Sequence, residues 1–461
     1  MKRRKRVPST SKVRREATGG KRGDGHRRSR RVRRPDPAAI RAGKPDPNLT
    51  GVAGLVGFGV HLRHLDVDRA LRERFRRLKS SPSVIYPMDA QMRLLLDALL
   101  VGESRVFGVE ALASDPLFTH LAGGVIPSID TLYDDLARFD EQALSDLEDM
   151  VAEHGLVRLP QVHGTFAYFD LDTSVLPVFG ELEGALPGPN PRYHGRPSYH
   201  PMIARIAETD TIVGAQLRPG DTGFGVDDVP TLRRWVRRAR AKLRKGTSLC
   251  VRIDSAGDCA DVLKALHEEQ AFYVIRGKLT PDMLNAIDAV KKWKTVDVDA
   301  ENKPIRQIAE LDFVRQSWTD HDVKVRVIVV RSTERAGKQI ALLDSFCGQV
   351  QVFLSNRPDD ADDIAWAYDR RAGIEPLIAE FKGAWGIAHT ATYGFAANHA
   401  MFLLKMLAHN LLDRYTHERF PRFAHWRTPW HRRVLLRIPG RLSRSGRKRK
   451  LHLLPGSPLR E

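Results

Sequence analysis

The feature that most constrains the fold is a run of apolar strands and helices between residues 165 and 276. The first strand is rich in aromatic residues and ends in two aspartates, and the next two flank a Thr-Asp turn and predict an antiparallel hairpin. The expected elements are three strands, a helix, a strand, a helix and a strand, over residues 165–172, 202–208, 211–217, 229–245, 248–254, 258–270 and 272–276. This pattern predicts a mixed α/β sheet, and ligands usually bind at the strand ends of such sheets.

The same order of elements is the one with which the ribonuclease-H-like fold begins. Further strands are expected between residues 279 and 357, and the next helix is expected to start near Asp362. We therefore expect a ribonuclease-H-like core in two parts, residues 160–278 and 358–415, interrupted by a β-rich insertion at residues 279–357.

The regions outside this core differ from it in composition. Residues 1–36 are a basic tail with almost nothing to build a core, and we expect them to be disordered. Residues 50–155 show apolar residues at helical spacing, with Ser128 as an expected helix N-cap. They form either a helical DNA-binding region or a packing domain without direct DNA contacts. Residues 416–461 are a basic C-terminal region.

The net charge indicates a polyanionic partner. Lysine and arginine number 75 against 56 aspartate and glutamate residues, which gives a formal charge of +19. Such a balance favours nucleic acid, although an anionic membrane surface would attract it too. No apolar run is long enough for a transmembrane helix, and the basic N-terminal residues lack the apolar segment of a secretory signal. Three cysteines fit a reducing cytoplasm.

Four polar residues that would share one helix face lie downstream of the strands: Tyr368, Arg371, Glu375 and Lys382. At about 100° per residue, their spacing places them within an arc of roughly 60°. Arginine and lysine bind phosphate oxygens, and glutamate can ligate a divalent metal. The alternative is an exposed helix with an ordinary Arg371–Glu375 ion pair. Pro376 lacks a backbone N–H, so we expect the helix to kink or restart there.

Three carboxylates lie where metal-dependent phosphodiester cleavage needs them. Asp172 and Asp254 end two expected strands, and Glu375 lies on the later helix. Such a set can hold two divalent cations about 4 Å apart, and oxygen ligands indicate Mg²⁺ or Mn²⁺ rather than zinc. Asp170 lies on the same face of its strand as Asp172, so either could be the ligand. Asp258 is expected to cap the following helix.

These residues resemble a known family, the insertion-sequence DDE transposases with a Tyr-x2-Arg-x3-Glu-x6-Lys signature. The signature spacing is matched at every position, by Tyr368, Arg371, Glu375 and Lys382. Asp172-Thr173-Ser174 is similar to the family's first aspartate segment, and residues 252–257 are similar to its second. Residues 195–201 resemble a loop of one branch of the family. The resemblance runs from about residue 50 to the C-terminus.

The resemblance implies the site residues and the cofactor. Asp172, Asp254 and Glu375 would ligate two Mg²⁺ (or Mn²⁺) ions per active site, and the Thr-Ser pair after Asp172 favours it over Asp170. The protein residues that bind DNA phosphates near the cut would be Tyr368, Arg371 and Lys382.

The resemblance also implies an activity and partners. The protein would cleave double-stranded DNA at the terminal inverted repeats of its own insertion sequence and join the 3′-hydroxyl ends to target DNA. It would act as a homodimer in a synaptic complex, without a membrane, in the cytoplasm at the nucleoid. Two alternatives are a ribonuclease-H-like DNA nuclease without strand transfer and an inactive DNA-binding relic.

Several further residues are weaker candidates. Trp293 and Trp318 in the insertion could hold a flipped base or simply pack in a core. Trp426 and Trp430 lie among many C-terminal arginines, which form either a DNA-contacting region or a solvated charged face. The histidines at positions 194 and 200 fit no metal motif and are expected to be ordinary loop residues.

Overall fold

The computed structural model describes residues 36–188, 194–333, 341–343, 346–446 and 448–460. The chain divides into two compact units, Met1–Asp46 and Pro47–Glu461. The described part of the first unit contains a short 3-10 helix, η1 (Pro37–Ala39), whose Ala38 N–H donates to the Asp36 carboxylate. The predicted basic tail lies, apart from Asp36, outside the described residues. All that follows concerns the second unit.

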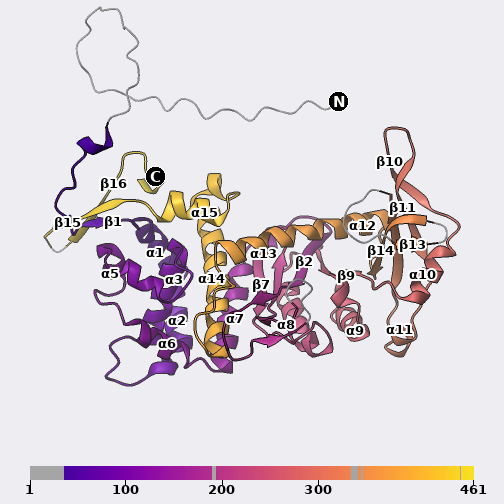
Figure 1. Ribbon diagram of the computed structural model, residues 1–461, viewed down its shortest axis with the longest axis horizontal. Helices are drawn as coiled ribbons and strands as arrows, with labels where there is room; N and C mark the ends of the chain where they lie inside the picture. The colour runs from indigo at the N-terminus through magenta and orange to yellow at the C-terminus, as the bar shows by residue number, and fades with distance from the viewer. Residues whose placement is uncertain (1–35, 189–193, 334–340, 344–345, 447, 461) are drawn as a thin grey trace, which may run out of the picture. The chain divides into compact units, whose positions relative to one another are not determined.

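A large mixed sheet forms the centre of the second unit (Figure 1). Its strands are, in spatial order, β10 (Lys294–Val298), β11 (Pro304–Leu311), β12 (Arg326–Ser332), β14 (Phe346–Ser355), β9 (Phe272–Arg276), β8 (Ser248–Ile253), β2 (Phe166–Thr173), β6 (Met202–Ile206) and β7 (Thr211–Gln216), with β13 (Ala341–Leu343) beside β14. A second small sheet, in the order β3-β5-β4, lies in the segment after β2 and comprises β3 (Leu176–Pro177), β4 (Leu186–Pro187) and β5 (Pro197–Tyr199).

Five of these strands have the topology of the ribonuclease-H-like fold. Strand β2 pairs antiparallel with β6 and parallel with β8, and β8 pairs parallel with β9. The hairpin of β6 and β7 forms as the sequence predicts. In order along the sheet, the first five strands of the core are therefore arranged 3-2-1-4-5. Helices α8 (Val229–Arg240) and α9 (Ala260–Glu268) supply the crossovers that parallel pairing requires. The predicted fold class is confirmed.

The inserted strands extend this same sheet. Strand β14 pairs antiparallel with β9, with Phe353 opposite Arg276, so the sheet continues from the core into the insertion. Two short helices, α10 (Pro281–Asp288) and α11 (Gln316–Asp320), lie between its strands in sequence. Asn356 fixes the exit from β14, since its side chain accepts from the Tyr273 N–H and donates to the Ala271 carbonyl. The chain then enters the signature segment α12 (Ala361–Asp369), η6 (Arg370–Gly373) and α13 (Ile374–Gly383).

Helix α14 (Phe395–Arg419) joins the sheet to the N-terminal helices. It contacts strand β7 and, among the N-terminal helices, α1, α3, α6 and α7 (Figure 1). The N-terminal helices are α1 (Gly54–His64), α2 (Val67–Phe75), α3 (Met88–Val101), α4 (Gly108–Leu112), α5 (Pro116–Leu121), α6 (Ile129–Leu136) and α7 (Glu141–Gly155). Ser128 caps α6 by accepting from the Thr131 N–H, as predicted. Because α14 is apolar on nearly all sides, one core is shared between the two regions.

The C-terminal segment packs back onto the N-terminal helices. It contains α15 (Thr428–His431), a π-helical turn η8 (Arg432–Leu436) and strands β15 (Gly440–Ser445) and β16 (Lys448–Leu453). Strand β15 pairs with the short β1 (Leu49–Thr50), so the two ends of the second unit meet in one sheet. No helix among the described residues is both long and apolar enough to span a lipid bilayer.

Asn410 provides a test of this shared core. It is fully buried on α14, where its side chain accepts from the Ile212 N–H and donates to the carbonyls of Ile212 and Val151. Asn410→Ala leaves these backbone groups of β7 and α7 without partners, and we expect it to lower the free energy of unfolding by roughly 2–4 kcal/mol. Chemical denaturation measures this, with Asn285→Ala on an exposed position of α10 as the control. Equal effects of the two substitutions would contradict the packing.

Candidate active site

Two aspartates lie side by side at one edge of the sheet. Asp172 is near the end of β2 and Asp254 directly follows β8, and because these strands are neighbours and parallel, their carboxyl ends meet. Oδ1 of Asp172 accepts from the Thr173 N–H at 3.1 Å and from Arg371 at 2.9 Å. Oδ1 of Asp254 accepts from the Ala256 N–H at 3.0 Å. The Oδ2 atom of each aspartate has no hydrogen-bond partner among the described residues.

The pKa of Asp172 reflects this position. Burial raises the pKa of its carboxyl group above the usual aspartate value, and the negative charge of Asp254 raises it further. The guanidinium of Arg371 acts in the opposite direction. A cation placed between the two aspartates would relieve both the burial penalty and the repulsion. The pair is therefore suited by charge and by donor chemistry to a divalent metal.

The signature residues do not lie on one continuous helix. The α-helix ends at Asp369, the chain makes a 3-10 turn over Arg370–Gly373, and a new α-helix begins at Ile374. Pro376 therefore falls in the first turn of α13, where its missing N–H has no intrahelical partner to lose. The interruption of the helix was predicted. The prediction that the four residues share one face of a single helix was wrong, because a 3-10 turn advances by about 120° per residue.

The signature side chains contact the edge of the sheet. The ring of Tyr368 packs on Phe353 with 4.7 Å between centroids, and burial raises its pKa to about 12. Nη2 of Arg371 donates to the Leu171 carbonyl and to Asp172, both at 2.9 Å. Nζ of Lys382 donates to the Val175 carbonyl at 3.3 Å. In this structure Arg371 therefore offsets the charge of Asp172, a candidate metal ligand, and a phosphate-binding role for these side chains stays a prediction.

Glu375 is exposed on α13 and makes no hydrogen bond or ion pair with a described residue. Within the described residues, no group of three or more His, Cys, Asp and Glu side chains is close enough together to hold a metal ion. The structure thus brings Asp172 and Asp254 together but does not place Glu375 with them. Its assignment as the third ligand stays a prediction.

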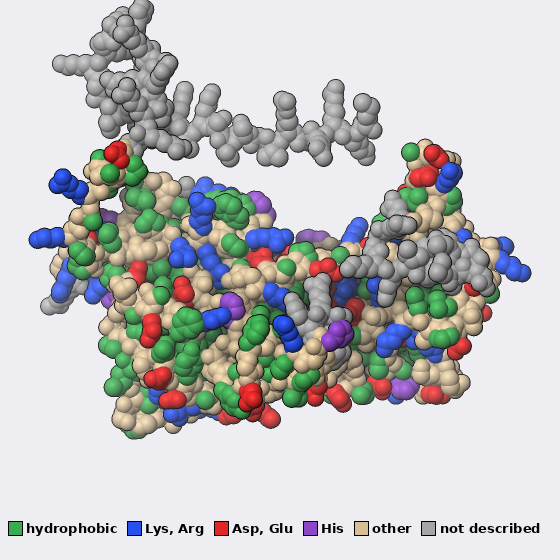
Figure 2. Space-filling model, in the orientation of Figure 1, with side chains coloured by type: hydrophobic (Ala, Val, Ile, Leu, Met, Phe, Trp, Pro, Cys, Tyr) green, Lys and Arg blue, Asp and Glu red, His purple; other side chains and the backbone are tan. Residues whose placement is uncertain are grey.

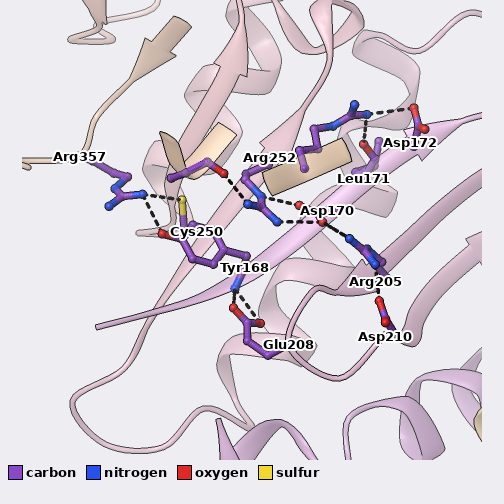
Figure 3. A network of polar contacts seen from close by, with 12 residues as sticks. Tyr168, Asp170, Leu171, Asp172, Arg205, Glu208, Asp210, Cys250, Arg252 and Arg357 are labelled. Carbon is purple, nitrogen blue, oxygen red and sulfur yellow. Dashed lines mark hydrogen bonds and ion pairs between the residues drawn. The ribbon is translucent and has the colours of Figure 1, made fainter. Parts of the chain in front are cut away.

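Asp170 has a different environment from Asp172 (Figure 3). It is fully buried between two arginines, which are themselves almost fully buried. Arg252 donates to Oδ1 at 2.6 Å and to Oδ2 at 2.9 Å, and Arg205 donates to Oδ2 at 3.0 Å. Because both oxygens are already held by guanidinium groups, Asp170 has little capacity left for a metal. The geometry favours Asp172 of the two candidates.

The same arginines fix the signature segment to the sheet. Arg252 donates to the carbonyl of Ala367 on α12, and its guanidinium lies 4.4 Å from the ring centroid of Tyr168. Arg205, which also pairs with Asp210, packs under the 3-10 turn. A Cβ added at Gly373 would lie 2.7 Å from Arg205 Nη2, so glycine permits this close approach. Asp170 thereby supports the position of the segment that carries Tyr368 and Arg371.

One prediction next to the site is wrong. Asp258 does not cap α9, because the N-cap position is Cys259. Its carboxylate accepts instead from the Lys278 N–H and from Arg315, both at 2.6 Å. Asp258 therefore anchors the loop after β9, a long-range contact that local sequence spacing does not reveal.

The sequence analysis also missed Arg276. This half-buried residue ends β9, the next parallel strand after β8, and its guanidinium has no hydrogen bond or ion pair with a described residue. It lines a cavity of about 550 Å³ together with Ser255, Lys278 and the backbone and side chains of β14, without a carboxylate. Such a cationic groove beside Asp254 is suited to a phosphate. The sequence could have indicated Arg276 as a candidate, because it ends an expected strand of the sheet, where ligands usually bind.

The other sequence candidates have structural contacts. Trp318 is buried against Phe313, and Trp293 donates to the Val290 carbonyl while the Arg331 guanidinium covers its ring. These contacts favour the packing interpretation for both tryptophans. Nδ1 of His200 lies 2.5 Å from the Thr222 carbonyl oxygen, as expected for a hydrogen-bonded loop residue.

The fold and the paired aspartates place the chain in the ribonuclease-H-like class. The family model of the transposase DDE domain, group 1, matches residues 39–461, and the chain belongs to this family. None of the curated proteins compared with the chain matches it.

Two solved structures are similar to the chain. The first is a piggyBac transposase synaptic complex with hairpin DNA, at 11% identity and a TM-score of 0.45, over 82% of this chain and 78% of that one. The second is a Drosophila P element transposase strand transfer complex, at 14% identity and a TM-score of 0.22, over 51% and 50%. The family assignment depends on the family model and not on these structures.

Asp170 and Asp172 are expected to differ when each is replaced by asparagine. Asp170→Asn leaves two buried guanidinium groups without their counter-charge, which should lower the free energy of unfolding by about 3–5 kcal/mol. Asp172→Asn removes the charge that faces the buried Arg371, but it also removes a carboxylate whose ionised form burial disfavours, and Arg371 keeps the Leu171 carbonyl as a partner. We therefore expect a smaller loss, of about 1 kcal/mol. Thermal and urea unfolding compare the two variants. A larger loss for Asp172→Asn would show that their structural roles are reversed.

Proposed function

We propose that the protein is a DNA transposase that cuts double-stranded DNA at the terminal inverted repeats of its own element and joins the 3′-hydroxyl ends to target DNA. One observation carries this proposal. In a chain of the transposase DDE family, Asp172 and Asp254 lie on neighbouring strand ends, and each keeps one carboxylate oxygen without a hydrogen-bond partner in the part of the chain that the structure describes. Glu375, at the start of α13, is the third carboxylate of the proposed site.

The proposed metal ligands are Asp172, Asp254 and Glu375. Two Mg²⁺ or Mn²⁺ ions bound there would activate the attacking oxygen and stabilise the leaving oxygen of the phosphodiester. Arg371 opposes the rise that burial causes in the pKa of Asp172 and holds that carboxylate in position, since it donates to it and to the neighbouring Leu171 carbonyl. The buried arginines on Asp170 keep α12 against the sheet, so that Tyr368 and Arg371 are oriented before DNA binds.

The cationic side chains around the aspartates would orient the DNA strand. Arg276 and Lys278 line the groove next to Asp254, and Lys382 approaches the segment after β2. Their charges would hold phosphates on both sides of the scissile bond, as phosphate contacts generally position a duplex. Tyr368 and Arg371 complete the proposed DNA-binding set. Joining two ends requires two active sites, which motivates the proposed homodimer acting on DNA in the nucleoid.

Removing either aspartate should abolish the chemistry without unfolding the protein. We expect Asp172→Asn and Asp254→Asn to slow Mg²⁺-dependent cleavage by on the order of 100- to 1,000-fold or more, because several kcal/mol of transition-state stabilisation are lost. The measurement is single-turnover nicking of supercoiled DNA that carries the element's own ends. Asp282→Asn, on an exposed position of α10, is the matched control.

The same assay separates the proposal from its alternatives. A pre-cut end with a free 3′-hydroxyl should be joined to a target plasmid by the wild-type protein. Cleavage without joining would support a nuclease instead. If the wild-type protein cuts no DNA with either metal, or the two variants cut as well as it does, the proposed active site is wrong.

The pH dependence of cleavage should report the environment of Asp172. Metal binding needs the ionised carboxylate, and burial raises the pKa of Asp172, so activity should be lost on acidification at a higher pH than for an ordinary aspartate. Arg371→Gln removes the charge that opposes this shift, and it should move the acidic limb to still higher pH. Cleavage rates measured across pH for both proteins test this. Identical acidic limbs would exclude Asp172 as the group that titrates.

A further inference from the structure

A cluster of aromatic side chains lies on the C-terminal segment, outside the active site. The ring of Trp426 lies between two others: its centroid is 4.6 Å from that of Phe423 and 6.3 Å from that of Trp430. Trp430 is 54% exposed, a large fraction for a tryptophan. Its ring packs edge-to-face on Trp426, which limits its motion, so Trp430 presents an apolar ring to solvent in a defined position.

The segment that carries these rings is positively charged. Between Glu418 and Glu461 the sequence contains no acidic residue. Carboxylates of other elements, Glu380 and Asp413 among them, line a cavity beside Trp426 and Arg427, whereas neither Trp430 nor Arg433 lines that cavity. The Arg433 guanidinium lies 5.5 Å from the ring centroid of Trp430. Arg427 is exposed, and its guanidinium makes no hydrogen bond or ion pair with a described residue. Figure 2 shows Lys or Arg side chains next to hydrophobic ones over α15. We call Phe423, Trp426, Trp430, Arg427 and Arg433 the Trp430 platform.

The platform is fixed rigidly to the protein interior. Arg432 is buried and donates to the carbonyls of Leu99 and Leu100 at the end of α3 and to that of Ala384 after α13. The Thr428 N–H donates to Glu380 of α13 at 2.9 Å. These contacts give Arg432 a structural role, which neither alternative for the C-terminal arginines, DNA contact or a solvated charged face, had included. They also mean that little conformational entropy is lost when a ligand binds to the platform.

The platform is connected to the helix that carries the proposed third metal ligand. Glu380 follows Glu375 by five residues on α13, which corresponds to about 7.5 Å along the helix axis. The Thr428 contact therefore fixes the platform to the same helix as Glu375, and a DNA end held at the proposed active site would lie near it.

We propose that the Trp430 platform binds unpaired bases of the DNA end that the active site processes. A duplex covers its own base faces, so an exposed tryptophan has a stacking partner only where bases are unpaired, whereas arginines can bind the phosphates of either form. Cutting at a DNA end and joining it elsewhere exposes such bases. This inference deepens the proposed function: the active site does the chemistry, and the platform holds the freed strand beside it.

Binding of labelled DNA without metal tests the platform separately from the chemistry. The probes are a 20-nucleotide thymidine strand and a 20-base-pair duplex, measured by fluorescence anisotropy with the full chain. Trp430→Ala should weaken binding of the single strand by about 5- to 150-fold, the range for loss of one stacked base, and change duplex binding less than about twofold. Trp430→Phe, which keeps an aromatic face, should retain most of the affinity.

Phe107→Ala is the matched control, because Phe107 is also an exposed aromatic, 50% accessible, with the Arg105 guanidinium 5.7 Å from its ring centroid. This control should change neither affinity. The inference is overturned if Trp430→Ala weakens both probes equally or neither, or if it alters the oligomeric mass while single-strand binding is unchanged, which would indicate a protein partner. Asp254→Asn should bind the single strand normally, so failure of the cleavage proposal and failure of the platform give different results.

Discussion

The structure depends on the buried Asp170 carboxylate between Arg205 and Arg252. A carboxylate with no solvent exposure is stable only if its charge is matched, and here both oxygens accept from guanidinium groups of the two adjoining strands. The two arginines carry one more charge than Asp170, and their remaining N–H groups have other partners. Arg205 also pairs with Asp210, and Arg252 also donates to the Ala367 carbonyl of α12. One ionic network therefore joins the centre of the sheet to α12, the helix that carries Tyr368.

This network explains why the active-site residues differ from their sequence neighbours. Asp170 and Asp172 are two residues apart on one strand, yet one is enclosed by arginines and the other opens toward Asp254 at the strand end. Arg371 reaches the same edge from the 3-10 turn and offsets part of the charge of Asp172. The edge of the sheet thus combines negative charge at the aspartates with positive charge at Arg371 and Arg276, as a site for a metal-bound phosphodiester requires.

The C-terminal region shows how buried and exposed arginines of one short segment divide their roles. Arg432 satisfies helix-terminal carbonyls of α3, which would otherwise be unpaired in the interior. Its neighbour Arg433 faces solvent over Trp430. The buried Arg432 and the exposed Arg433 are therefore adjacent in sequence. The contacts of Arg432 with the interior hold the Trp430 platform in the position in which DNA binding is proposed.

The sequence by itself determined the order of strands and helices along the core, the hairpin of β6 and β7, the aspartates at the strand ends and the break near Pro376, because these follow from local periodicity and backbone chemistry. It did not reveal the shared core around α14, the extension of the sheet by the insertion, the anchoring role of Asp258 or the position of Arg276 beside Asp254. Only the tertiary structure decided which of Asp170 and Asp172 has an open oxygen and which C-terminal arginines are buried. Those outcomes depend on contacts between residues far apart in the chain, and the spacing of residues along a sequence carries no information about them.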